Sequence, residues 1–433
     1  METLLPVYTF SPLFRPCFIA GIIAIIRIQM SRLNQKKLKK LAKKVWGNIK
    51  TVLLTIRRKL KLIIALILLF AVVLFLIVEL FSVLLIKKLG WNYEPAYLRI
   101  IKGYTSSNLV GGRTEYHSWG SWNVSNYSGR IANNCFDIKY NFNSYGARDK
   151  ERSKEGQNRT IVLGDSFTEG WGVPQDKILA ADLEKLSGKE YLNFGVSGSG
   201  TGPLNEYVLY RDFASEFEHD AVLVGFYPGN DFKDNDPVAW GGSTTVYYRP
   251  FWKLTEDKQD IEIVYFAKQE EGKFLPGLEP ENRTPHFKIY QGAREFSAFL
   301  NLLVVLQNYK ISLSKQSATQ FAYNLEVSED AKQATLIAYD KFAQLIGDKK
   351  KYIFVIPAAS DVFYYLKTGK AKVPQFEEFK DSLTSQGWQV IDTIDAFANL
   401  PEDKIPEYFI CDGHWNYKGD QLVADYLHKI IDQ

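Results

Sequence analysis

The stretch Ile161-Val-Leu-Gly-Asp-Ser-Phe-Thr-Glu-Gly-Trp-Gly-Val173 decides how this chain folds. Its apolar start predicts a short buried strand over Thr160–Leu163, with a helix after it. Gly164 permits a tight turn, which places the Ser166 hydroxyl at a helix N-terminus. Backbone amides that the helix leaves unpaired there can stabilise a developing oxyanion. Gly-Asp-Ser alone is also an ordinary helix N-cap, but the longer stretch is far more specific.

Downstream of this stretch, strands and helices alternate. The segment at 221–227 (AVLVGFY) is apolar without alternation, which is typical of a strand covered on both faces. This rhythm predicts an α/β fold, a three-layer α/β/α sandwich around a parallel five-stranded sheet. The predicted strands are Thr160–Leu163, Tyr191–Phe194, Ala221–Tyr227, Tyr352–Ile356 and Trp388–Ile391, with predicted helices at Lys177–Leu186 and Lys418–Ile431.

Functional groups in such sheets gather beyond the carboxyl ends of the strands. A serine nucleophile needs a base, and the base needs an orienting acid. Of the five histidines, His414 stands just before the last predicted helix, two residues after Asp412. His219 and His428 are expected to be structural or surface residues. Ser166, His414 and Asp412 are therefore the candidate nucleophile, base and acid.

Four blocks in this order make the sequence resemble the SGNH (GDSL) hydrolase family, in its membrane-anchored bacterial envelope form. They are Gly164-Asp-Ser166, Asn193-Phe-Gly-Val-Ser-Gly198, Gly229-Asn-Asp231 and Asp412-Gly-His414. The resemblance implies a flavodoxin-like sheet and an esterase with Ser166, His414 and Asp412 as catalytic triad. It also implies an oxyanion hole made by the backbone amides of Ser166 and Gly198 and by the Asn230 side chain. It implies structural roles for Asn193, Asp231 and Asp165.

The last block departs from the family's commoner Asp-x-x-His, because Cys411 stands three residues before His414. The Asp-x-His-Trp form resembles relatives that handle polysaccharide acyl groups, including O-acetyltransferases. Upstream, Asn143–Asp149 resembles a segment that precedes the first block in envelope members. We expect it to pack against the sheet, with Arg148 as a further candidate for substrate contact.

A membrane segment precedes the catalytic blocks. Residues 62–86 form an apolar stretch with one ionisable residue, Glu79, and about 20 apolar residues span a bilayer. Residues 1–61 carry a net charge of +13, which leaves −9 on the remaining 372 residues, so the overall +4 does not indicate nucleic-acid binding. Because Arg57, Arg58, Lys59 and Lys61 precede the span, the N-terminus is predicted to be cytoplasmic and the body extracytoplasmic, periplasmic or cell-surface.

The N-terminal residues carry three further expectations, the first of which bears on this topology. The apolar run Cys17–Ile26 is too short to span a bilayer, but if it did, the body would face the cytoplasm. Met30 begins a more ordinary start, so residues 1–29 are expected to come from an overextended start site. The basic run Lys36–Lys50 is predicted to be either an amphipathic helix on anionic lipid or a solvated arm.

The sequence thus predicts four parts: a basic arm (1–61), a transmembrane helix (62–86), an irregular lead-in (89–156) and the hydrolase domain (157–433). An insertion at about 236–348 contains a predicted hairpin, Ile261–Phe274, and an apolar helix, Glu295–Ile311. It is interpreted as a cap over the substrate or as irregular decoration. Cys135 and Cys411 could pair in an exported body. No metal or cofactor motif is present.

The predicted reaction is hydrolysis of O-acetyl or short acyl esters, on an envelope or extracellular glycan. Transfer of the same acyl group to a glycan hydroxyl is the alternative, followed by a lipase or lysophospholipase, or an inactive glycan-binding relative. The aromatic residues Trp119, Trp122, Tyr247, Tyr248 and Trp252 suit a sugar-facing surface and an aromatic core equally well.

Overall fold

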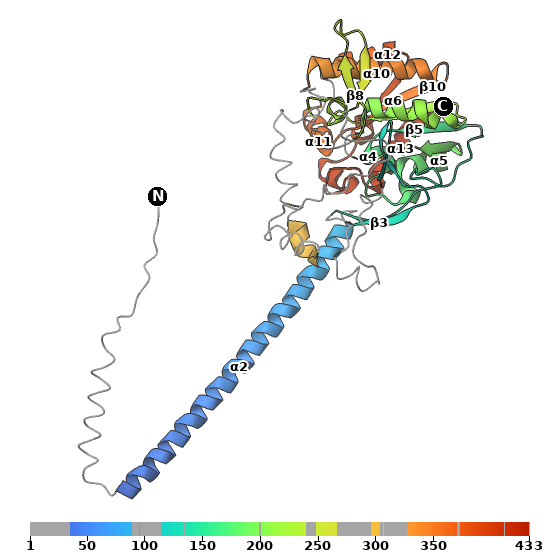
Figure 1. Cartoon of the computed structure of the whole chain (residues 1–433). Coiled ribbons are helices and arrows are strands. Elements are labelled where there is room, and N and C mark those ends of the chain that lie inside the picture. Colours follow the sequence, from blue (N-terminus) through green and yellow to red (C-terminus); the bar gives the residue numbers. More distant parts are fainter. Residues whose placement is uncertain are drawn as a thin grey trace, which may run out of the picture. The chain divides into compact units, whose positions relative to one another are not determined.

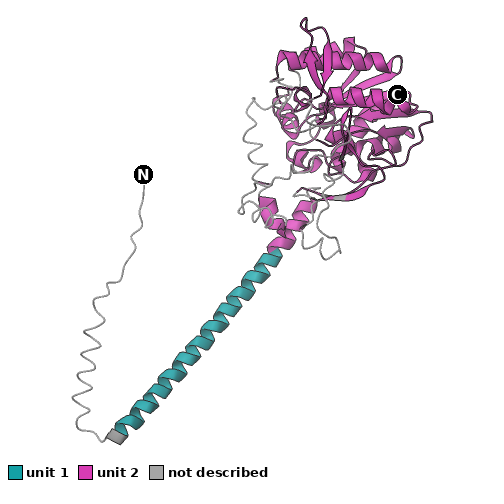
Figure 2. Cartoon of the chain, in the orientation of Figure 1, with its two compact units in different colours: residues 1–77 teal, residues 78–433 magenta. Residues whose placement is uncertain are grey.

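The computed structural model describes residues 35–88, 95, 114–132, 135–198, 201–239, 248–265, 296–303, 306, 327–369, 373–410 and 412–432. Predictions for Cys17–Ile26, for residues 1–29 and for Cys411 and Tyr247 lie outside these residues. The chain forms two compact units, Met1–Ile77 and Val78–Gln433 (Figure 2).

The described part of the first unit is helical. Helix α2 (Gln35–Lys88) contains the predicted span 62–86 and also the basic run Lys36–Lys50. It is long and apolar enough to cross a membrane, as expected. Its last residues, Val78–Lys88, belong to the second unit.

The second unit is built on a sheet of five parallel strands in the order β11-β10-β7-β5-β6. Two of them, β5 and β10, are labelled in Figure 1. The α/β prediction is therefore confirmed, and each predicted strand exists within two residues of its predicted bounds. These strands are β5 (Arg159–Leu163), β6 (Glu190–Asn193), β7 (Ala221–Phe226), β10 (Lys350–Val355) and β11 (Gln389–Asp392). The chain steps to one side of β5 and then to the other, so the topological switch point lies at β5.

Helices cover both faces of this sheet. Helices α5 (Leu179–Ser187) and α13 (Tyr417–Ile431) pack together on one face, and α6 (Pro203–Asp212), α10 (Glu329–Ile346) and α12 (Pro374–Ser385) pack on the other (Figure 1). The other helical elements of this unit in the described residues include α4 (Ser166–Glu169), α7 (Asp231–Asp234), α11 (Ala359–Thr368), η3 (Gln175–Lys177), η4 (Ala214–Glu216), η7 (Thr393–Phe397) and η8 (Glu402–Tyr408).

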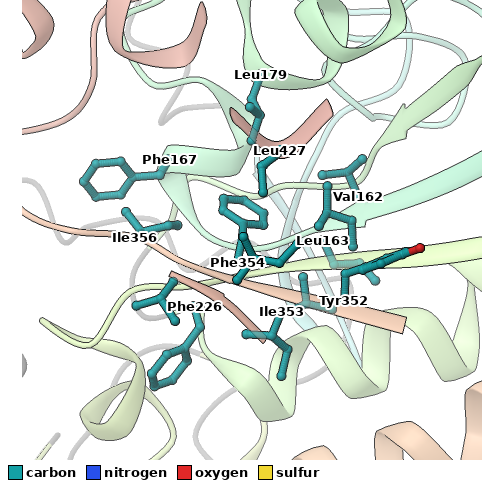
Figure 3. Close-up of a cluster of buried hydrophobic side chains, with 14 of the residues drawn as sticks. Val162, Leu163, Phe167, Leu179, Phe226, Tyr352, Ile353, Phe354, Ile356 and Leu427 are labelled. Atoms are coloured by element: carbon teal, nitrogen blue, oxygen red, sulfur yellow. The ribbon is translucent and has the colours of Figure 1, made fainter. Parts of the chain in front are cut away.

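The core lies on both sides of the strands. Figure 3 shows Leu179 from α5 and Leu427 from α13 on one side, and Phe226 and Ile353 on the other. All four are at most 2% exposed. Burying one such side chain stabilises the fold by roughly 1.5–3 kcal/mol. Strands whose side chains are apolar on both faces are therefore stable only in a sheet that helices cover on both sides.

Two hairpins form the described part of the lead-in. Strands β1 (Thr114–His117) and β2 (Gly120–Asn123) pair antiparallel, as do β3 (Ser128–Ala132) and β4 (Asp137–Asn141). The second hairpin has its own apolar cluster, in which Phe136 and Tyr140 are fully buried and Ile410 also packs. Ile410 belongs to the loop before α13, so the lead-in contacts the predicted site loop.

The insertion differs from its prediction in two respects. Strand β9 (Ile261–Val264) lies where the first strand of the predicted hairpin Ile261–Phe274 was expected, but it pairs with the preceding strand β8 (Phe251–Leu254), and residues 266–274 lie outside the described part of the chain. The reason for this pairing is a polar turn in which Asp257 Oδ1 accepts hydrogen bonds from the Thr255 hydroxyl and the Gln259 amide. Helix α10 was predicted to be part of the insertion at about 236–348. It instead connects β7 to β10 and packs on the sheet as part of the core.

Candidate active site

Ser166 lies at the start of α4, immediately after β5. Gly164 has φ +151°, a conformation that favours glycine, and a Cβ there would lie 2.1 Å from Thr168 Oγ1. Asp165 is the N-cap, since its carboxylate accepts the Phe167 amide at 2.9 Å. The turn therefore needs both a glycine and a capping acid, and it leaves the Ser166 side chain only partly buried.

His414 reaches Ser166 from the loop before α13. Ser166 Oγ and His414 Nε2 lie 2.7 Å apart, across 248 residues of sequence. A bridge between Phe409 and Trp415 closes this loop, and Asn416 caps α13 by accepting the amides of Lys418 and Gly419. The Phe167 ring packs against the imidazole with ring centres 4.6 Å apart. The loop and the α4 turn thus hold the two side chains within hydrogen-bond distance.

Asp412 contacts the second ring nitrogen of His414, although only one residue separates the two in the sequence. Its Oδ1 lies 3.1 Å from His414 Nδ1 and also accepts the His414 backbone amide at 3.2 Å. Gly413, between them, has φ +98°, so a glycine in the left-handed region lets an acid two residues upstream turn back onto the histidine. The Asp-x-His spacing is therefore compatible with an acid–imidazole contact.

Trp171 is a fourth member of this arrangement, and no sequence motif selected it. Its indole N–H donates to Asp412 Oδ2 at 3.0 Å, and its ring packs edge-on against Phe136 at 5.1 Å. Burial raises the pKa of Asp412, but hydrogen bonds and the charge interaction with His414, together with Trp171, outweigh burial and hold the pKa below its usual range. Asp412 is therefore kept ionised.

The predicted oxyanion donors follow strands β5, β6 and β7, which are adjacent in the sheet. Gly198 is exposed, and a Cβ there would lie 2.4 Å from Ser121 Oγ. The Asn230 side-chain nitrogen donates to Asp234 Oδ2 at 2.7 Å. One of its two N–H groups is thus taken by a neighbouring acid, so its role toward substrate stays a prediction.

Four carboxylic acids are buried beside Asn230, and only Asp165 and Asp231 were singled out from the sequence. Burial raises the pKa of Asp165 to about 6 and that of Asp234 to about 7. For Glu206 and Asp231, burial and the neighbouring acids raise the pKa well above its usual range. Asp231 Oδ2 accepts the Tyr227 amide at 2.6 Å. The cluster therefore holds protons near neutral pH.

Other selected residues have structural partners. Asn193 supports its loop as expected, since its Oδ1 accepts the Gly195 amide at 3.0 Å. His219 is buried between the Tyr210 hydroxyl and the Phe217 carbonyl, and His428 contacts Asp432. The suggestion that Arg148 touches substrate is wrong: its side chain is 0% exposed, because it donates to the Glu169 carbonyl at the end of α4, at 3.1 Å, and to the Gly170 and Val173 carbonyls in the loop that follows.

Comparison with known proteins gives limited likeness. No family model and no curated protein matches the chain. Among solved structures, it is similar to a protein described as lipolytic, of the G-D-S-L family, from Desulfitobacterium hafniense DCB-2. That structure is 12% identical with a TM-score of 0.30, and the match covers 63% of this chain and 99% of the other. The lipase Lip_vut3 from goat rumen metagenome is 11% identical with a TM-score of 0.27, covering 63% and 96%.

Proposed function

We propose that this chain is a serine esterase that cleaves short acyl esters through an acyl-enzyme. The observation that carries the proposal is the continuous contact from Ser166 through His414 to Asp412, 2.7 Å and 3.1 Å long. A hydroxyl, an imidazole and an ionised carboxylate in this order are the groups that nucleophilic acyl transfer requires.

In the proposed reaction, Ser166 Oγ attacks the ester carbonyl carbon while His414 Nε2 takes its proton. The resulting oxyanion is stabilised by the Ser166 and Gly198 amides and the Asn230 side chain. Collapse expels the alcohol, which receives the proton from His414, and leaves the acyl group on Ser166. Water, activated by His414, then releases the carboxylic acid.

The substrate belongs to the same proposal: an O-acetyl or short acyl group on an envelope or extracellular glycan. The Asp412-Gly-His-Trp415 form supports it through its resemblance to polysaccharide-modifying relatives. The aromatic residues do not add support, because Trp122 is only 3% exposed and Trp119 stacks on Phe213. A glycan hydroxyl in place of water would make the same acyl-enzyme a transferase.

The proposed location is a bilayer crossed by α2, with a cytoplasmic N-terminus and an extracytoplasmic body. Two observations support this orientation. The basic residues precede the apolar stretch, and Cys135 is disulfide-bonded, a modification that persists in oxidising compartments. The partner of Cys135 lies outside the described residues. Its pairing with Cys411 stays a prediction, supported by the packing of Ile410 in the same cluster.

The test uses the full chain in detergent with p-nitrophenyl acetate. Ser166→Ala should lower turnover by about 10⁴-fold or more, whereas Ser215→Ala, an exposed serine on η4, should not. A fluorophosphonate should label Ser166 in the wild type, as read by mass spectrometry. If wild type and Ser166→Ala are equally inert on this ester and on acetylated glycans, the esterase proposal is refuted.

A second measurement separates hydrolysis from transfer. The enzyme is given an acetyl donor together with a glycan acceptor, and the products are quantified. Free acetate in proportion to donor consumed supports the esterase. Acetylated glycan at the expense of acetate, dependent on Ser166, would establish the transferase instead.

A further inference from the structure

Glu79 is the one ionisable residue within the apolar stretch 62–86. It lies seven residues before Ile86, about 10 Å along the helix at 1.5 Å per residue. Its side chain is nevertheless 3% exposed. Placing an acid at this depth of a membrane helix costs free energy unless the acid faces protein and has hydrogen-bond partners. The partners of Glu79 therefore identify the segment that lies beside the helix.

The partners come from the start of the segment 296–303 in the insertion. The Glu79 carboxylate accepts the Ser297 hydroxyl, the Ala298 amide at 2.8 Å and the Phe299 amide at 3.3 Å. Residues 298–303 are helical, so Glu79 accepts amides that the first turn of this helix leaves without an internal partner. Glu79 and these partners all belong to the unit Val78–Gln433 (Figure 2).

The two helices bury their polar and small side chains against the protein. On α2 the buried residues after Glu79 are Ser82, Val83 and Ile86. On the insertion segment they are Ser297, Ala298, Asn301 and Leu302. Polar side chains therefore face the protein together with Val83, Ile86 and Leu302, whereas a helix at a water surface points its polar side chains outward.

The outward faces are apolar on both helices. Phe296, Leu300 and Leu303 recur at helical spacing and are 55%, 39% and 46% exposed, and Leu306 is also exposed. On α2, Leu80, Phe81 and Leu84 are exposed within five residues of Glu79, the residue that holds the two elements together. Exposed apolar side chains gathered on two contacting elements mark a binding surface. Since one of the two elements is the end of the helix proposed to cross the bilayer, the occupant is lipid.

We infer that residues 296–303, together with Leu306, form a second membrane-inserted element, which enters the acyl-chain region beside the end of α2 and is held there by Glu79. The inference rests on the proposed crossing of the bilayer by α2. The catalytic unit is then attached to lipid at two points of its sequence, about 220 residues apart.

The experiment places a photoreactive benzoylphenylalanine at Leu300 or at Leu303 of the full chain. The protein is reconstituted into vesicles of phosphatidylethanolamine and phosphatidylglycerol, illuminated and analysed for adducts by mass spectrometry. Phe81 on α2 is the positive control. Leu186 and Leu345 are matched controls, because they are exposed to a similar degree, 42% and 44%, on the catalytic unit.

Lipid adducts at positions 300 and 303 should approach the yield at position 81 and exceed those at 186 and 345 about tenfold. Yields equal to those at 186 and 345 would overturn the inference, and so would cross-linked dimers at 300 and 303, which would mean that a second copy covers the surface. Loss of adducts at position 81 as well would overturn the membrane crossing itself. Esterase activity toward p-nitrophenyl acetate, measured on each sample, is scored separately.

A separate variant tests whether Glu79 anchors the second element. Glu79→Ala should lower the adduct yield at position 300 severalfold and leave the yield at position 81 unchanged, because it removes the acceptor of three hydrogen bonds without altering the outer face of α2. Retained esterase activity would show that the variant folds. Unchanged yield at position 300 would overturn the anchoring role of Glu79.

Discussion

Trp171→Phe is the sharpest test of how the site works, because it removes one hydrogen bond and keeps an aromatic ring. The Trp171 indole donates to Asp412 Oδ2 at 3.0 Å, and the aspartate side chain is 30% exposed. The phenylalanine ring can still pack on Phe136. In the proposed mechanism, Asp412 orients His414 and stabilises the imidazolium, so a less firmly held Asp412 should slow the chemical step.

The expected size follows from the contact. A hydrogen bond to a charged group contributes about 1.5–3 kcal/mol, and partial exposure of Asp412 reduces this to about 1–1.5 kcal/mol. Since 1.36 kcal/mol is a factor of ten in rate, kcat should fall about 5- to 12-fold. KM should change little, because Trp171 acts through Asp412 and not on the substrate.

The assay is steady-state hydrolysis of p-nitrophenyl acetate by the full chain. Trp252→Phe is the matched control: its ring is partly buried in the insertion, and its indole N–H has no hydrogen-bond partner among the described residues. A double-mutant cycle with Asp412→Asn isolates the coupling. Trp171→Phe should have little further effect in the Asp412→Asn background. An equal loss in both backgrounds, or none in the wild type, would refute the positioning role.

Three further outcomes are expected. Gly164→Ala should destabilise the fold by about 2–4 kcal/mol, read as a lower denaturation midpoint, because its Cβ would meet Thr168 Oγ1 at a strained φ; an unchanged midpoint would contradict the tight turn. Asp231→Asn should leave Tm near the wild-type value below about pH 4, where Asp231 is protonated in both the folded and the unfolded state, and raise it increasingly toward pH 9. The raised pKa of Asp231 means that wild-type stability is full below its unfolded pKa and is lost as pH rises through the folded pKa; a Tm difference that does not depend on pH would speak against this. Reduction of the Cys135 disulfide should cost about 2–4 kcal/mol in thermal or chemical denaturation, and Cys135→Ser should make the protein insensitive to reductant.

The sheet was predictable because each of its strands carries a local signal. The run 221–227 is uniformly apolar, and β7, which it contains, is buried at every position. The pairing of β9 with β8 was not predicted, because the turn between them depends on the side chain of Asp257, which hydropathy does not reveal. Helix α10 was assigned to the insertion because its buried face consists largely of alanine and threonine, a weak apolar signal.

The pairing of Ser166 with His414 could be expected from their places at strand ends, although 248 residues separate them. The contribution of Trp171 could not, because an indole N–H aimed at a carboxylate depends on the packing of Phe136 from the lead-in. Glu206 and Asp234 were missed for a related reason: a charged side chain on a helix is expected to face water unless the fold shows otherwise.

The contact between Glu79 and the insertion also determines where this chain can be cut. A soluble fragment that begins at residue 89, after the apolar stretch, would lose Val78–Lys88, which belong to the catalytic unit. Ser297, Ala298 and Phe299 would lose their acceptor, and the faces that now cover Val83 and Ile86 would meet water. We expect such a fragment to self-associate, so a preparation that keeps α2 in detergent is the sounder starting point.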